Sequence, residues 1–143
     1  MNDSHYKLDK RLLEAYKATD YVVESLDICI KIGVQNEKLE EFLIDNQAFS
    51  YGIITAYNPF SEKVLTSENQ KKQLELEEIL LEKDFLFLPA MGKPTLSDWL
   101  PEPSFFIVDI KKRAVKALAT SFRQNAIIYG TINSVPKLIS QLS

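Results

Sequence analysis

The chain has 143 residues and a formal net charge of −3, from 20 acidic and 17 basic side chains. This length fits one domain with its own core, and 45% hydrophobic and 26% charged residues are ordinary for a globular protein. The acidic balance argues against a general nucleic-acid partner, which binds a basic surface. No apolar run could cross a bilayer and the polar start does not resemble a signal peptide, so we expect a cytosolic protein with no membrane partner.

The first part of the chain is expected to form a helix, a strand and a second helix. Residues 6–18 predict a helix, because apolar side chains recur on one face at spacings of three and four. Residues 21–32 alternate between apolar and polar side chains, which is typical of one strand with a buried face. Cys29 lies inside this strand and is expected to be buried and inert. Asn36 can cap a short helix that ends near Asn46.

The most distinctive stretch is a predicted central strand over residues 50–57 that stops at Asn58-Pro59. It has to leave the sheet there, because proline cannot donate a hydrogen bond to a strand ladder. A long helix is predicted over residues 67–83, with a capping box that begins at Ser67.

The rest of the chain is expected to contain short strands and one further helix. Asp109 can cap that helix. Residues 135–142 form either a hairpin with the strand before them or a terminal helix, and the turn residues at 130–134 favour the hairpin. The predicted segments are a strand at 85–88, a loop at 94–103, a strand at 104–109, a helix at 110–122 and a strand at 126–129.

This order predicts a single α/β or α+β domain over residues 1–143, with a mixed sheet of about five to six strands and packed helices. Suppose that strand 104–109 is antiparallel to the central strand and parallel to strand 126–129. The end of the central strand then shares one sheet edge with the beginnings of the other two. The polar residues that would meet there are Asn58, Ser61, Ser67, Asn69, Glu102, Ser104, Gln124 and Asn125.

Such an edge would suit a small polar or anionic ligand. Its amides could donate hydrogen bonds, and the free N–H groups of the long helix would attract negative charge. Glu102 is a weak candidate for a general base, provided that burial raises its pKa, and Tyr16, Tyr21, Tyr57 or a lysine are alternative acid–base groups. Each polar residue also has a structural interpretation, since asparagine and serine commonly cap turns and helices.

Several chemical motifs are missing from the sequence. There is no glycine-rich phosphate loop, and no nucleophile elbow surrounds a serine. The single histidine, His5, argues against a catalytic triad or a multi-histidine metal site. We therefore expect no metal and no cofactor.

The chain resembles a bacterial family of uncharacterised proteins, domain-of-unknown-function family 3293. The resemblance singles out Thr55, Asn58, Ser61, Asn69, Gln124 and Asn125, and it implies no activity. Arg123 stands where a small residue is expected, which leaves the geometry of that helix end open. The matching segments are AYKATDY (15–21), ITAYNPFS (54–61), PSF (103–105) and FRQNAI (122–127).

Two functions are compatible with these observations. In the first, the protein binds a small ligand at the polar edge, with or without catalysis. In the second, it is a non-catalytic protein-interaction module, and the polar residues only brace loops. A protein partner would then use the proline-rich loop around Trp99 or the basic helix from Lys111.

Overall fold

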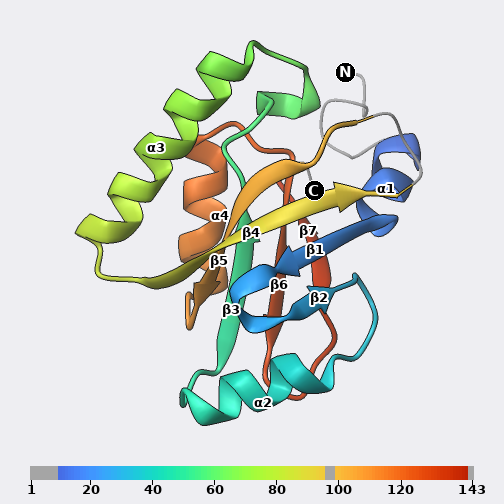
Figure 1. Cartoon of the computed structure of the whole chain (residues 1–143), viewed down its shortest axis with the longest axis vertical. Helices are drawn as coiled ribbons and strands as arrows, with labels where there is room; N and C mark the ends of the chain where they lie inside the picture. The colour runs from blue at the N-terminus through green and yellow to red at the C-terminus, as the bar shows by residue number, and fades with distance from the viewer. Residues whose placement is uncertain (1–9, 96–98, 142–143) are drawn as a thin grey trace.

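A seven-stranded sheet, in which every neighbouring pair is antiparallel, forms the centre of the molecule (Figure 1). The computed structural model describes residues 10–95 and 99–141. The strand order is β2-β1-β4-β5-β3-β6-β7. The strands are β1 (Thr19–Val23), β2 (Ile28–Ile30), β3 (Ser50–Ile54), β4 (Leu86–Pro94), β5 (Glu102–Val108), β6 (Ala126–Thr131) and β7 (Lys137–Ser140).

The described residues form four α-helices around this sheet, so the architecture is α+β (Figure 1). Two 3₁₀ turns, η2 and η3, follow β1 and precede α3. The helical elements are α1 (Lys10–Lys17), η2 (Glu24–Leu26), α2 (Glu37–Asp45), η3 (Pro59–Ser61), α3 (Thr66–Glu82) and α4 (Lys112–Ser121).

The expected sheet was mixed and had five to six strands. The observed sheet is antiparallel throughout, and it has seven strands because segment 21–32 forms a hairpin of two strands. β1 turns through η2 and pairs with β2, with Tyr21 opposite Ile30. Asp27 makes the reversal with a φ of 54°, a left-handed conformation that aspartate tolerates better than most residues. Both arms of the hairpin bury alternate residues. The sequence pattern is therefore the same as that of one continuous strand and does not indicate the turn.

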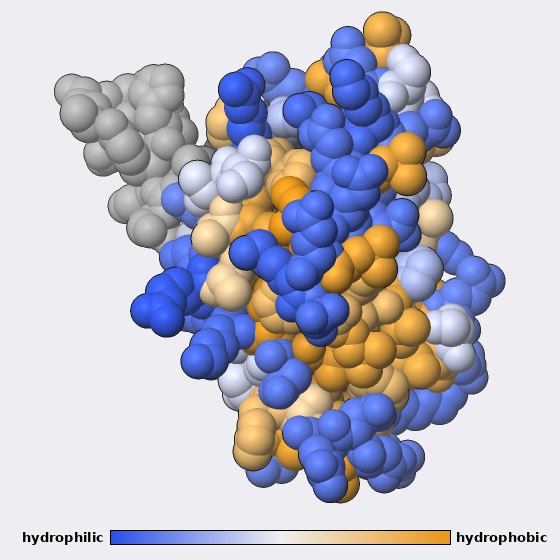
Figure 2. Space-filling model, turned by 90° about the vertical axis from the view of Figure 1, so that its left-hand side faces the viewer, coloured by the Kyte–Doolittle hydropathy of each residue, from blue (hydrophilic) through white to orange (hydrophobic). Residues whose placement is uncertain are grey.

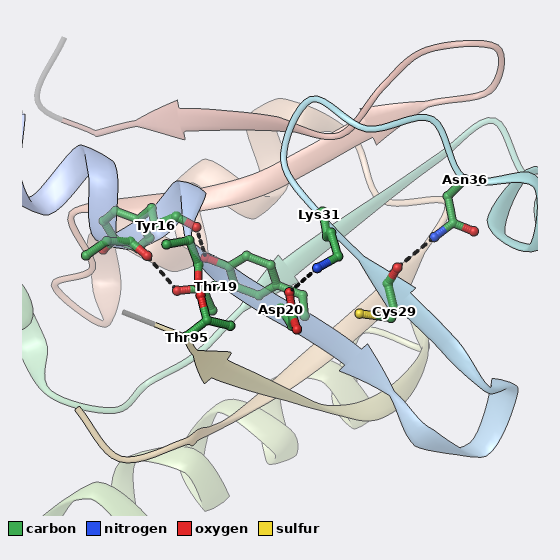
Figure 3. A network of polar contacts seen from close by, with 10 residues as sticks. Tyr16, Thr19, Asp20, Cys29, Lys31, Asn36 and Thr95 are labelled. Carbon is green, nitrogen blue, oxygen red and sulfur yellow. Dashed lines mark hydrogen bonds and ion pairs between the residues drawn. The ribbon is translucent and has the colours of Figure 1, made fainter. Parts of the chain in front are cut away.

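The same hairpin overturns the expectation for Cys29, which is exposed. Its neighbours Ile28 and Ile30 face the core, and Cys29 points away from it because successive strand residues alternate sides. The Cys29 carbonyl oxygen accepts a hydrogen bond from the Asn36 side chain at 2.8 Å (Figure 3).

The predicted helix caps had mixed outcomes. Asn36 caps α2 as expected, and its side-chain oxygen accepts from the Leu39 N–H at 3.0 Å. The capping box at Ser67 was wrong, since α3 begins one residue earlier and has no side-chain cap. Asp109 does not cap α4 either; it has a φ of 58°, and its carboxylate accepts from the Phe49 N–H at 2.9 Å. The C-terminal hairpin is confirmed, as β7 pairs with β6.

The sheet buries a separate apolar cluster on each face. β3 contributes to both, with Ile53 on one side and Ile54 on the other. Helices α3 and α4 cover the Ile54 face, and α2 covers part of the Ile53 face (Figure 1). The outer surface around α3 combines charged residues with an apolar area, as Figure 2 shows.

Tyr51 is the largest side chain fully buried on the Ile53 face, where only 1% of it is exposed. Its ring stacks on Phe106 with 5.5 Å between centroids and lies over Gly130. The hydroxyl is buried and has no hydrogen-bond partner among the described residues. Burial therefore raises the pKa of Tyr51, and the hydroxyl contributes a desolvation cost without a compensating bond.

Replacing Tyr51 by phenylalanine is expected to raise the free energy of unfolding by about 1 kcal/mol, because it removes an unpaired buried group. Urea denaturation followed by circular dichroism measures this change. Tyr129→Phe is the matched control, since that hydroxyl donates to the Ile110 carbonyl at 2.9 Å and its loss should destabilise. Equal destabilisation by both variants would contradict the assignment of Tyr51 as unpaired.

Candidate functional site

Asn58 is the centre of a hydrogen-bond network that joins three distant segments. It lies just after β3 in a left-handed conformation, with a φ of 48°. Its backbone N–H donates to Asn69 Oδ1 at 2.8 Å, and Asn69 Nδ2 donates back to Asn58 Oδ1 at 3.0 Å. Asn58 Nδ2 donates to Glu102 Oε2 at 2.7 Å. The loop after β3 is thereby fixed to α3 and to the first residue of β5.

The sheet topology explains why these residues meet. β5 is antiparallel to β3, with Ile54 opposite Phe105, so β5 begins where β3 ends. β6 is also antiparallel to β3, on its other side, and therefore begins at the same edge. β5 and β6 thus point the same way, although β3 separates them. The strand directions assumed from the sequence are therefore those of the structure.

A second set of bonds holds the start of β6. Asn125 Nδ2 donates to Ser61 Oγ at 2.9 Å, and Gln124 Nε2 donates to the Tyr57 carbonyl at 3.1 Å. Arg123, at the end of α4, has a φ of 55°, and its carbonyl accepts from the Phe60 N–H at 2.6 Å. Glycine would adopt this left-handed conformation without strain, and the helix end keeps it with Arg123.

Two of the candidate hydroxyl groups are occupied by the backbone. Thr55 Oγ1 donates to the Pro103 carbonyl at 2.7 Å and accepts from the Tyr57 N–H at 3.0 Å. Ser104 Oγ donates to the Glu102 carbonyl at 3.1 Å. The Thr55 bond to Pro103 ties the end of β3 to β5, and the Ser104 bond lies within β5.

A cavity of about 110 Å³ opens beside this network. Five strands supply its walls, mainly through residues spaced two apart, because such residues point to the same face of a sheet; Ile54 and Ile127 also line it. Leu12, Ala15 and Tyr16 of α1 also line it. The strand pairs are Thr19 and Tyr21 of β1, Ile53 and Thr55 at the end of β3, Gly92 and Pro94 of β4, Glu102 and Ser104 of β5, and Ala126 and Ile128 of β6.

Hydrogen bonds at its carboxyl end hold α1 against the sheet (Figure 3). Thr19 Oγ1 donates to the Ala15 carbonyl at 2.7 Å, and the Thr95 N–H donates to the Ala18 carbonyl at 3.0 Å. The Thr95 hydroxyl donates to the same Ala18 carbonyl. These bonds position Tyr16 at the cavity.

Glu102 is the only carboxylate among the lining residues, and no lysine, arginine or histidine lines the cavity within the described chain. Burial raises the pKa of Glu102, and the hydrogen bond from Asn58 partly opposes the rise. Burial also raises the pKa of Tyr16 and of Tyr21, so both phenols stay protonated at neutral pH and can donate hydrogen bonds. The site therefore combines one partly desolvated acid with neutral polar groups.

The predicted site residues divide into those that line the cavity and those that support it. Asn69 and Asn125 are buried behind the wall, where each holds a lining residue in place. Ser67 does not reach the cavity. The lining group is Thr55, Asn58, Ser61, Glu102, Ser104 and Gln124.

Sequence reasoning missed the contribution of α1, β1 and β4 to the walls. Tyr16 and Tyr21 were named only as alternative acid–base groups, although the resemblance includes both of them. Trp99 also lines the cavity, and Lys63 Nζ lies 5.3 Å from its ring centroid. Thr19 lies outside the predicted strand 21–32, although it belongs to β1, so its spacing from Tyr21 was not used as a signal.

The described part of the chain holds no cluster of three or more histidine, cysteine, aspartate or glutamate residues that could bind a metal. His5 lies outside the described residues. None of the described helices has the length and apolar character needed to span a membrane.

Residues 54–127 match the family described as "Protein of unknown function (DUF3293)". The chain belongs to this family. The DUF3293 match confirms the resemblance, and it runs from the last residue of β3 into β6, so it contains Asn58, Glu102 and Gln124. Helix α1 and β1, which bring Tyr16 and Tyr21 to the cavity, precede the matched region. No curated protein and no solved structure matches the chain.

Proposed function

We propose that the protein binds a small polar molecule in the cavity between α1 and the sheet. The observation that carries the proposal is the position of Glu102, a partly buried acid in the cavity wall that Asn58 holds through only one of its oxygens. Among the described residues no other donor reaches this carboxylate, so its second oxygen is available to a ligand. A concave site with an apolar wall and a few fixed polar groups is the usual form of a small-molecule site.

The size of the cavity limits the ligand. A dry cavity of about 150 Å³ can hold benzene, which has six heavy atoms, so a ligand of at most roughly six heavy atoms suits this smaller cavity of about 110 Å³. The apolar side chains of Leu12, Ile53 and Ile128 would contact its hydrocarbon part. The polar groups near Glu102 would orient its polar end.

The anionic ligand that the sequence suggested fits this site less well. The N–H groups at the start of α3 were expected to attract negative charge, but no residue of α3 lines the cavity. The lining instead contains a carboxylate. Binding is also better supported than catalysis, since no serine or threonine hydroxyl in the lining donates to the Glu102 carboxylate.

A cavity-filling substitution tests the proposal. Polar fragments of about six heavy atoms should shift the amide resonances of residues around Glu102 in ¹H–¹⁵N spectra. Ala15→Phe places a ring into the cavity from α1 and should weaken this binding at least tenfold. Ala117→Phe is the control, because Ala117 is an exposed residue of α4. Fragment binding that Ala15→Phe leaves unchanged, or shifts that map to another surface, would overturn the proposal.

The alternative function is a protein-interaction module. It is favoured by the hydrogen bonds of Asn58, Asn69 and Asn125 to other residues of the chain, because these bonds brace loops. The exposed leucines of α3, Leu74 and Leu81, add to the apolar area beside that helix. Under this alternative no fragment binds in the cavity. Binding to a partner protein would then be lost on substituting Leu74 or Leu81 and would be unaffected by Ala15→Phe.

A further inference from the structure

The charge of the cavity wall points to a class of ligand, an inference that rests on the proposed function. Glu102 is the one acid of the lining, and no basic side chain among the described residues lies there to neutralise it. Within residues 10–95 and 99–141, its hydrogen-bond partner is the neutral amide of Asn58. A partly buried carboxylate without a countercharge favours a ligand that supplies one.

The aromatic lining supports the same class. Tyr16, Tyr21, Tyr57 and Trp99 all line the cavity. Aromatic faces attract cations, with tryptophan the most effective. The ring of Trp99 already has the ammonium group of Lys63 5.3 Å from its centroid, although Lys63 itself lies outside the lining.

We propose that the ligand is a small organic amine, whose protonated nitrogen pairs with Glu102 and whose hydrocarbon part contacts the apolar wall. The ammonium group would donate to the Glu102 oxygen that Asn58 leaves free. The phenolic oxygens of Tyr16 and Tyr21 can accept further hydrogen bonds from it. Leu12 of α1 and Ile53 and Ile128 of the sheet would contact the alkyl part.

A matched set of probes separates this inference from the broader proposal. Butylammonium, butanol and butyrate have similar size and differ in charge. Titrations at pH 7, followed by ¹H–¹⁵N shifts, should show butylammonium binding at least tenfold more tightly than butanol, and no binding of butyrate. If butanol or butyrate binds in the cavity as tightly as butylammonium, the amine inference is overturned and the small-ligand site stands. If none of the three binds, the amine inference fails, and the fragment titration with Ala15→Phe decides the broader proposal.

Glu102→Gln tests the role of the charge itself. Glutamine keeps an oxygen that can accept from Asn58 and removes the negative charge, so butylammonium binding should fall at least tenfold while butanol binding is unchanged. Glu62→Gln is the control, because Glu62 is exposed and lies outside the lining. Unchanged butylammonium binding by Glu102→Gln would overturn the inference.

A measurement on the unsubstituted protein keeps the test independent of folding in the variant. Among the described residues, Tyr16 of α1 and Tyr21 of β1 are titratable groups that interact with Glu102, and both stay protonated while Glu102 titrates. Bound butylammonium should therefore lower the raised pKa of Glu102, as followed by ¹³C resonances of its carboxyl group. A pKa that does not fall on saturation with butylammonium would contradict the pairing.

Discussion

Replacing Gly130 by alanine is expected to lower the free energy of unfolding by about 3 kcal/mol, the upper part of the usual range for overpacking a core. A Cβ atom built on Gly130 would lie 2.6 Å from two ring carbons of Tyr51 and closer still to its hydroxyl oxygen. Tyr51 is only 1% exposed and stacked on Phe106, so the ring has no free space into which to move. The strain must therefore spread into the pairing of β3 with β6, where Gly130 lies opposite Tyr51.

Urea denaturation of Gly130→Ala should show an earlier midpoint with an unchanged slope. Gly92→Ala is the matched control in another strand, because a Cβ there would have no neighbour closer than 3.6 Å. A smaller residue at position 51 should rescue the variant, so Tyr51→Leu combined with Gly130→Ala should lose less stability than the two single changes added together. Equal stability of Gly130→Ala and Gly92→Ala would contradict the close packing.

The position of Gly130 shows what sequence patterns can and cannot predict in this fold. The sequence predicted a strand that ends at residue 129 and a turn that begins at Gly130, whereas Gly130 lies inside β6. A lone glycine does not reveal that an aromatic ring lies across it. The polar edge was predictable, because Asn58, Glu102 and Gln124 lie at strand ends and only the relative directions of three strands had to be assumed. Both assumed directions proved right.

The covering of that edge was not predictable. Tyr21 faces the cavity because β1 pairs with β4, and Gly92 is its partner across the ladder. That pairing joins segments far apart in the chain, and no local pattern encodes it. Because segment 21–32 was predicted as one strand, Asp27 was not recognised as a turn residue, and the hairpin that carries Tyr21 was missed. Without β1 in place, α1 and Tyr16 could not be assigned to the site.

The second large effect concerns Asn69, a buried amide of α3. Only 4% of it is exposed, and both ends of its side chain are bonded to Asn58. Asn69→Ala would leave the Asn58 backbone N–H without an acceptor and Asn58 Oδ1 without one of its donors. An unpaired buried group costs about 1–3 kcal/mol, so we expect the free energy of unfolding to fall by about 3 kcal/mol.

Gln70→Ala is the control on the same helix, because Gln70 is exposed and a surface change should stay within about 0.5 kcal/mol. Asn69→Asp adds a further comparison. Aspartate can still accept from the Asn58 N–H, but its second oxygen faces Asn58 Oδ1, an acceptor, so it should recover only part of the loss. Stability of Asn69→Ala equal to that of Gln70→Ala would show that water or a new partner satisfies Asn58.

Substituting Asn69 and substituting Glu102 should therefore have different effects on stability and on ligand binding, although both side chains are bonded to Asn58. Asn69 lies outside the cavity lining, so its substitution should reduce stability first and disturb binding only through the displaced Asn58 side chain. Burial raises the pKa of Glu102, which means that its charged form is disfavoured in the folded protein. Its contribution to stability is greatest below its unfolded pKa and is lost as the pH rises through the folded value.

Glu102→Gln should accordingly be as stable as the unsubstituted protein at pH 7, or more stable, while it loses affinity for an ammonium probe. Substitution of a residue with a purely structural role would show the opposite pattern: it would lower the stability and leave ligand binding unchanged. Measuring urea denaturation and butylammonium binding on Asn69→Ala and Glu102→Gln together separates the two roles. If Glu102→Gln loses as much stability as Asn69→Ala, the carboxylate is a structural element of the edge, and the small-ligand site loses the observation that carries it.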